Sequence, residues 1–215
     1  MKSVFSYNSD INKNAILNWR TDKQKYIQNL NILADGYLEG ASILLKDCID
    51  DNASNRADGL IFPIIFSINH GIELYEKSIC WSLNVLLDTN DKFDSTHNIF
   101  SIWKNSKKLI IKFGFNDERT KNSFDTLTMR LEQYLNEMAN TICKNQYNNK
   151  ELENSIFFSR YPFDKKYDNY FYIDKIDNVN VDLENLLEIC LNIKNGLSVI
   201  SEYYCELADE KLTLN

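Results

Sequence analysis

The sequence predicts an all-α fold, a helical bundle of about five long helices with a short β-hairpin inserted before the last helix. Apolar residues recur at spacings of three and four over most of the 215 residues, which is the period of one helix face. Only six glycines and two prolines interrupt the chain, too few for the many turns of a β-sandwich or barrel. The hydrophobic share of 44% suffices for one core. We therefore expect a single domain over 21–215, preceded by an irregular arm over 1–20.

The arm shows no clear period, and we expect it to dock on the bundle through Phe5, Ile16 and Trp19. A helical pattern then runs from Asp22 to about Cys48. The stretch 50–59 that follows is rich in Asp, Asn, Ser and Gly, which predicts a turn.

The next segment, from about 61 to 86, carries the strongest helical pattern. Phe62 and Phe66 give it a second apolar side, so we expect this helix to lie at the centre of the bundle. Pro63 is expected in its first turn, where a missing N–H has no cost. The main apolar stripe consists of Ile61, Ile65, Ile68, Ile72, Tyr75, Ile79, Leu83 and Leu86.

Three more helices complete the prediction. Ser95 or Thr96 is expected to cap a third helix, and a fourth runs from 116 or 117 to Cys143. The fifth begins at Asp182 and keeps its helical period to about residue 207. Between the fourth and fifth helices, the aromatic-rich stretch 155–173 is split by a turn-like DKKYDN and predicts the β-hairpin.

Composition excludes several classes of protein. Five cysteines without a CxxC pair, and no histidine at metal spacing, predict reduced thiols and neither a metal site nor another cofactor. Neither a signal peptide nor a run of eighteen apolar residues is evident, so we expect a cytoplasmic protein. A net charge of −7 argues against nucleic-acid binding over the whole surface but leaves room for a local basic stripe. Gly-rich phosphate loops, GxSxG and HExxH are all missing.

His70, Glu73 and Lys77 form the first candidate site. Their spacing places them on one helix face, in line with Phe62 and Phe66. One interpretation is a Glu73–Lys77 ion pair on the surface with a hydrogen-bonded His70 beside it. The other is a polar cluster that faces a cleft or a dimer partner, with His70 as a proton-transfer group.

The start of the third helix holds the second histidine of the chain, His97, which is either structural or catalytic. Lysines give that helix one basic side, either a solvated face or a track for a phosphate backbone. These lysines are Lys104, Lys107, Lys108 and Lys112.

Arg160 lies between aromatic residues, with Tyr161 directly after it. Its guanidinium is suited to stacking on rings and to gripping a phosphate or a carboxylate. The alternative is a buried arginine paired with an acid.

Several segments, in order, resemble HEPN-domain proteins over about residues 26–207. They are the A-x-x-Y-L-x-x-A pattern from Ala34 to Ala41, FPIIFSINHGIELYEKSICWSL, STHNIFSIW, SRYPFD and the long last helix. HEPN proteins commonly carry an H-x-x-x-E-x-x-x-K-like run, a T-H-[DN]-[IL] motif and an R-Y-P motif at these places. Here the places are held by His70, Glu73 or Glu76 and Lys77, by Thr96–Ile99 and by Arg160–Pro162.

The resemblance implies a helical bundle, often a homodimer, from bacterial toxin–antitoxin, abortive-infection or other phage-defence systems. Many members cut RNA without a metal by means of an R-x4–6-H motif. This chain departs from that pattern, because Arg56 precedes His70 by fourteen positions and no histidine follows His97.

Three hypotheses follow. The first is a HEPN-like, homodimeric protein that binds RNA, a nucleotide or a partner such as an antitoxin, with Glu73, Lys77, Lys104, Lys108 and Tyr161 as ligand contacts. The second is a metal-independent ribonuclease assembled from His70, His97 and Arg160. The third is a non-enzymatic immunity or partner protein. Whether the protein is an enzyme stays open at this point. Separation of His70, His97 and Arg160 within hydrogen-bond reach, or across a dimer cleft, favours the enzyme, and wide separation favours binding.

Overall fold

Five α-helices form the bundle in the computed structural model, which describes residues 3–89, 91–143, 156–164, 166–173 and 177–214. The predicted all-α fold is confirmed. The helices are α1 (Tyr26–Asp50), α2 (Ala57–Leu86), α3 (Ile99–Phe113), α4 (Glu118–Cys143) and α6 (Leu183–Leu214), with short 3-10 turns η1 (Ile11–Lys13), η2 (Ala53–Asn55) and η3 (Ile156–Ser159).

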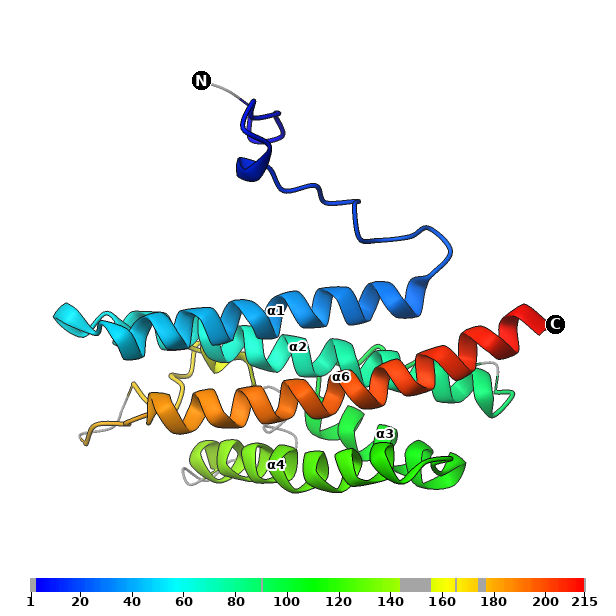
Figure 1. Cartoon of the computed structure of the whole chain (residues 1–215). Helices are drawn as coiled ribbons and strands as arrows, with labels where there is room; N and C mark the ends of the chain where they lie inside the picture. The colour runs from blue at the N-terminus through cyan, green and yellow to red at the C-terminus, as the bar shows by residue number, and fades with distance from the viewer. Residues whose placement is uncertain (1–2, 90, 144–155, 165, 174–176, 215) are drawn as a thin grey trace.

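Helix α2 is the central helix, as its pattern predicts. It packs against α1, α3, α6 and η3. Ile68, Ile72 and Ile79 of its main stripe are fully buried. In Figure 1, α1 runs in the opposite direction to α2 and α6, and α3 and α4 lie together on the side of the bundle away from α1.

Local capping chemistry sets two of the predicted helix starts. Asp182 Oδ1 accepts a hydrogen bond from the Asn185 amide at 3.1 Å, and Asp117 Oδ1 accepts one from the Thr120 amide at 2.8 Å. The prediction for α3 was wrong, because Asn98 caps it rather than Ser95 or Thr96. Asn98 Oδ1 accepts from the Phe100 and Ser101 amides at 3.1 and 3.3 Å, which satisfies two donors of the first turn.

Pro63 does not lie in the first turn of α2. The helix begins at Ala57, so Pro63 is its seventh residue. A proline there cannot donate to the carbonyl of Gly59, four residues earlier. Gly59 is exposed, so water can satisfy that carbonyl. The turn-rich composition of 50–59 conceals this early start.

The predicted β-hairpin over 155–173 is not formed as strands in the described part of that stretch. Residues 156–159 form η3, and a single antiparallel bridge joins Phe163 to Asn169. The turn between them is present, since Asp164 Oδ1 accepts hydrogen bonds from the Lys166 and Asp168 amides at 2.7 and 3.0 Å. Strand pairing stops early because Phe158 and Phe171 turn inward and pack edge to face in the core.

The N-terminal arm does not bury its predicted anchors on the bundle, although Ile16 and Trp19 line a hollow together with Leu33 of α1. Phe5 and Trp19 are 83% and 77% exposed, and Ile16 is 57% exposed. Figure 1 shows the arm leaving the bundle at the start of α1 and extending away from it. Its local shape comes from its own polar groups, because the Asn14 side chain donates to the carbonyls of Asn8 and Asp10.

The structure describes the side chains of four of the five cysteines. Cys48, Cys80, Cys190 and Cys205 are free and buried, whereas the side chain of Cys143 lies outside the described residues. None of the helices in the described ranges has a stretch long and apolar enough to cross a bilayer.

Candidate functional site

Glu73 is the centre of the polar cluster on α2. Its side chain is buried, and its Oε1 atom lies 2.7 Å from Lys77 Nζ and 2.8 Å from His97 Nδ1. His70 Nδ1 lies 3.7 Å from the other carboxylate oxygen, Oε2. Both histidines of the chain therefore face one carboxylate.

Two different parts of the sequence build this cluster. Steps of three and four residues along α2 place His70 and Lys77 on either side of Glu73. His97 comes from the link that precedes α3. Asn98 caps α3 directly after it, and the Thr96 hydroxyl accepts from the Asn98 amide at 3.1 Å, which fixes the backbone on both sides of His97.

The hydrogen bonds to Glu73 keep it ionised. Burial by itself would raise its pKa, but the hydrogen bonds with Lys77 and His97, together with the nearby His70, outweigh burial and lower the pKa to about 2. Because both Glu73 and Lys77 are buried, the interpretation as a surface ion pair was wrong. Lys77 lies under the carboxylate and over the Phe93 ring, 5.5 Å from its centroid, where it positions Glu73 and has little access to a ligand.

Both imidazoles turn the same ring nitrogen toward Glu73. An Nδ1–H that donates to the carboxylate leaves Nε2 as the acceptor on the opposite side of the ring. Among the described residues, no hydrogen bond engages the Nε2 atom of either histidine. The side chains of His70 and His97 are 29% and 65% exposed, so solvent reaches both.

Aromatic rings continue the site along α2 toward Arg160. The His70 ring stacks on Phe66 with centroids 5.7 Å apart, and it meets the Tyr37 ring of α1 at 4.5 Å. The Arg160 guanidinium lies 5.5 Å from the centroid of Phe66 and 5.7 Å from that of Tyr161. Arg160 and His70 thus share the Phe66 ring. We call the set Tyr37, Phe66, His70, Glu73, His97 and Arg160 the α2 strip.

The structure brings only some of the predicted site residues into this strip. Tyr161 is exposed beside Arg160, and Arg160 is exposed as well, which excludes the buried arginine of the alternative interpretation. Lys104 and Lys108 are exposed on α3, and no described ion pair joins them to the strip. Their neighbour Lys107 pairs with Glu132 of α4 at 2.6 Å.

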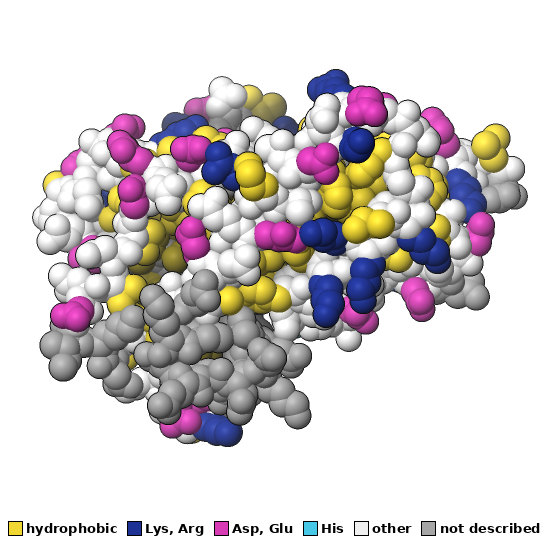
Figure 2. All heavy atoms as spheres, turned by 90° about the horizontal axis from the view of Figure 1, so that it is seen from below, with side chains coloured by type: hydrophobic (Ala, Val, Ile, Leu, Met, Phe, Trp, Pro, Cys, Tyr) yellow, Lys and Arg dark blue, Asp and Glu magenta, His cyan; other side chains and the backbone are white. Residues whose placement is uncertain are grey.

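The surface over α3 and α4 is mixed in charge. Figure 2 shows basic side chains gathered in the right half of this face with acidic ones among them. A uniformly basic track for a phosphate backbone is therefore not present on the face in this view.

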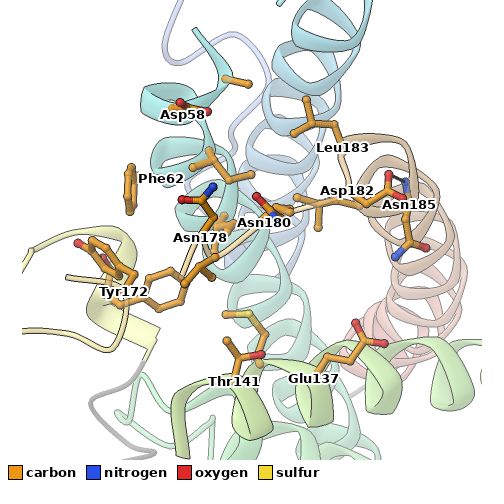
Figure 3. Close-up of a pocket in the computed structure, with 18 of the residues that line it drawn as sticks. Asp58, Phe62, Glu137, Thr141, Tyr172, Asn178, Asn180, Asp182, Leu183 and Asn185 are labelled. Carbon is orange, nitrogen blue, oxygen red and sulfur yellow. Dashed lines mark hydrogen bonds between the residues drawn. The ribbon is translucent and has the colours of Figure 1, made fainter. Parts of the chain in front are cut away.

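Sequence reasoning missed three features. Tyr37 approaches His70 from α1, a contact between distant segments that no local pattern signals. Glu76, one turn after Glu73, is buried, and its carboxylate has no hydrogen-bond partner among the described residues. The third feature is a cavity of about 660 Å³ where the α1–α2 link and the end of α4 meet the start of α6 (Figure 3).

No arrangement of three or more His, Cys, Asp or Glu side chains in the described ranges is placed to hold a metal ion. Comparisons with known proteins give no further assignment, since no family model, no curated protein and no solved structure matches the chain.

Proposed function

We propose that the protein binds RNA or a nucleotide at the α2 strip, as a HEPN-like, homodimeric component of a bacterial toxin–antitoxin or phage-defence system. The observation that carries this proposal is the Phe66 ring shared by Arg160 and His70. A guanidinium makes charge-assisted contacts with phosphate, and half-exposed rings beside it stack on bases. A cation and stacking surfaces in one row match the two chemical parts of a nucleotide.

The position of the HEPN-like motifs supports the same proposal. The H-E-K run supplies His70 and Glu73, the T-H-N-I motif supplies His97, and the R-Y-P motif supplies Arg160. These motifs are far apart in the sequence, yet each contributes a side chain to the strip.

A second candidate function is metal-independent cleavage of RNA, favoured by the two imidazoles that share Glu73. The Nε2 atom of one histidine would accept the proton of a ribose 2′-hydroxyl while the hydroxyl oxygen attacks the adjacent phosphorus. The bond from phosphorus to the 5′-oxygen then breaks, and the other imidazole, which would enter the step protonated on Nε2 as well, donates that proton to the oxygen. A cyclic phosphate and a free 5′-hydroxyl result. Glu73 acts as the positioning residue, and Arg160 would neutralise the phosphate.

Binding is tested by replacing Arg160 with Ala and measuring the affinity for a short single-stranded RNA and for ATP by fluorescence anisotropy. Loss of a charge-assisted contact should weaken binding about 10-fold or more. For RNA the salt dependence should become shallower by about one unit of slope. Arg119→Ala is the matched control, because Arg119 is exposed on α4 and this substitution also removes one positive charge. Equal affinities for the two variants would contradict the proposal.

Cleavage is tested with His70→Ala and His97→Ala on the same RNA. In an enzyme each variant should lower the rate by roughly 10²–10⁴. In a binding protein each variant should change the affinity for RNA only modestly, and neither the parent nor the variants should cleave the RNA. If the parent neither binds nor cleaves RNA or nucleotides, a partner-protein role replaces both candidates.

A further inference from the structure

The N-terminal arm carries large apolar side chains that the bundle of its own chain does not cover. Seven of them are more than half exposed, and they are Val4, Phe5, Tyr7, Ile11, Ile16, Leu17 and Trp19. Exposed apolar side chains gathered in one segment are typical of a surface that binds a partner.

The arm is also basic on an acidic protein. The arm and the five residues that link it to α1, residues 1–25 together, hold five Lys or Arg and two Asp, so they carry a charge of +3 while the remainder of the chain carries −10. A partner surface for the arm should therefore combine an apolar floor with negative charge.

The cavity in Figure 3 has both properties. Its floor is aromatic and aliphatic, with Phe62 and Tyr172 facing it from α2 and from the segment after η3. Asp58, Glu137 and Asp182, which Figure 3 labels, lie around it together with Asp177, and no Lys, Arg or His is among the lining residues in the described part of the chain.

We infer that this cavity receives the N-terminal arm of a second copy of the chain, in a reciprocal exchange between two protomers. Trp19 supplies the apolar anchor, and Arg20 and Lys23 face the carboxylates around it. Aromatic and Arg side chains seated in a pocket are typical anchors of protein interfaces.

The length of α1 favours a second copy for the anchor Trp19, because it separates Trp19 from the part of the cavity that Asn52 and Ala57 line in the same chain. The arm leaves the bundle at Tyr26, whereas Asn52 and Ala57, which line the cavity, follow the far end of α1. A helix of 25 residues spans about 37 Å. The seven residues from Trp19 to Tyr26 reach about 25 Å at most. Two copies with antiparallel α1 helices place each arm beside the cavity of its partner.

RNA is the competing partner for a basic arm with aromatic residues. The branched aliphatic side chains of Val4, Ile11, Ile16 and Leu17 favour the cavity instead, because such groups neither stack on bases nor contact phosphates. An acidic cavity would repel RNA.

A charge-swap experiment tests the exchange. The arm variant carries Lys13→Glu, Arg20→Glu and Lys23→Glu, and the cavity variant carries Asp58→Lys, Glu137→Lys and Asp177→Lys. Asp182 is left unchanged because it caps α6. At tens of micromolar, light scattering should give the parent twice the chain mass of 25.2 kDa and each variant alone 25.2 kDa. An equimolar mixture should regain the doubled mass, since both arm–cavity contacts in the mixed dimer are then complementary.

Two further variants complete the design. Trp19→Ser, at a side chain exposed in the single chain, should give the single-chain mass without loss of helix content. Lys104→Glu with Lys108→Glu and Lys112→Glu reverses the same charge on α3 and should keep the doubled mass.

A monomeric parent, an arm variant that stays dimeric, or a mixture that stays monomeric would overturn the inference. Arm variants that keep the parent mass but bind RNA less tightly would assign the arm to RNA. None of these substitutions lies in the α2 strip, so failure here is distinct from a failure of Arg160→Ala to weaken ligand binding.

Discussion

Glu73 and Glu76 lie one turn apart on α2 and are both buried, yet their surroundings are opposite. Glu73 meets Lys77 and two imidazoles, and it stays ionised. Both carboxylate oxygens of Glu76 have no hydrogen-bond partner in the described part of the chain. Burial raises the pKa of Glu76 well above its ordinary value, and the negative charge of Glu73 raises it further. The ionised carboxylate of the strip therefore lies one turn from a carboxylate whose pKa is raised well above its ordinary value.

Glu76→Gln should stabilise the protein, and more so at neutral than at acidic pH. Below the ordinary pKa of 4.5, Glu76 is protonated in both the folded and the unfolded chain. As the pH rises, the unfolded chain ionises first, so the free energy of unfolding of the parent falls. Glutamine does not titrate and escapes this loss. Urea unfolding of the parent and of Glu76→Gln at about pH 4.5 and 7.5 measures the free energy of unfolding of each. A difference between the two proteins that is equal at both pH values would contradict the raised pKa.

Ile72→Ala should lower the free energy of unfolding by about 2–5 kcal/mol, because Ile72 is fully buried in the core and its truncation leaves a cavity. Ile111→Ala on α3 is the matched control. Ile111 is 66% exposed, so its truncation should lower the free energy of unfolding much less. Denaturant unfolding of both variants compares them. A loss below about 1 kcal/mol at Ile72 would show that the site is not core.

At the scale of the elements, glycines set how closely two helix pairs approach. A Cβ atom on Gly71 of α2 would lie 2.6 Å from Leu38 Cγ of α1 and 3.2 Å from the Ala34 carbonyl oxygen. On Gly196 of α6, a Cβ atom would lie 2.9 Å from Leu127 Cβ of α4. The close α1–α2 contact is what carries Tyr37 to the His70 ring and so helps to form the strip.

Gly71→Ala should destabilise the protein by about 1–3 kcal/mol, because the added methyl group forces α1 and α2 apart or displaces Leu38. Gly40→Ala in α1 has open space around the new methyl group and should stabilise the helix by up to about 1 kcal/mol. Thermal unfolding of the pair distinguishes packing from helix propensity. If both variants raise the melting temperature, the two helices are not in tight contact at Gly71.

The predictions of elements succeeded where the signal was local. The stripe of α2 and the caps at Asp117 and Asp182 depend on residues within a few positions of each other. Ser95, Thr96 and Asn98 are all capping residue types, so the choice of Asn98 could not be made from the sequence. Because proline has no N–H to donate, Pro63 suggested that α2 starts later than it does. The Gly59 carbonyl, which loses this hydrogen bond, is exposed to water, and the local sequence does not show that exposure.

In the candidate site, too, the contacts between residues close in the sequence could be predicted and the distant ones could not. The alignment of His70, Glu73 and Lys77 was predictable from helical spacing, and the structure keeps it. His97 reaches Glu73 across 24 residues, a contact that depends on how the link before α3 folds back. The burial of Glu73 and Lys77 could not be predicted from helical spacing either. Glu73 and Lys77 are polar residues at positions that would be exposed on an isolated helix, but the link that brings His97 covers them.

At the scale of the whole molecule, charge is separated along the bundle. The arm and its link to α1, which carry +3, lead into the start of α1, and the acidic cavity lies near the end of α1, where Asn52 and Ala57 line it. The α2 strip lies on other residues, with Arg160 and two histidines as its cationic or proton-carrying groups. Two copies joined by their arms would neutralise the arm and cavity charges against each other and leave both strips available to a ligand.

Salt should weaken the association of the two protomers if the arm docks by charge as well as by apolar contact. The screening length falls from about 10 Å at 0.1 M salt to about 3 Å at 1 M, which reduces the attraction of Arg20 and Lys23 to the carboxylates around the cavity. The dissociation constant from sedimentation equilibrium should therefore rise with salt in the parent. The charge reversals of the arm variant should flatten this dependence. Trp19→Ser should instead raise the dissociation constant at every salt concentration, because the contact it removes is apolar. A parent dimer equally tight at 0.1 M and 1 M salt would show that charge has no part in holding the arm.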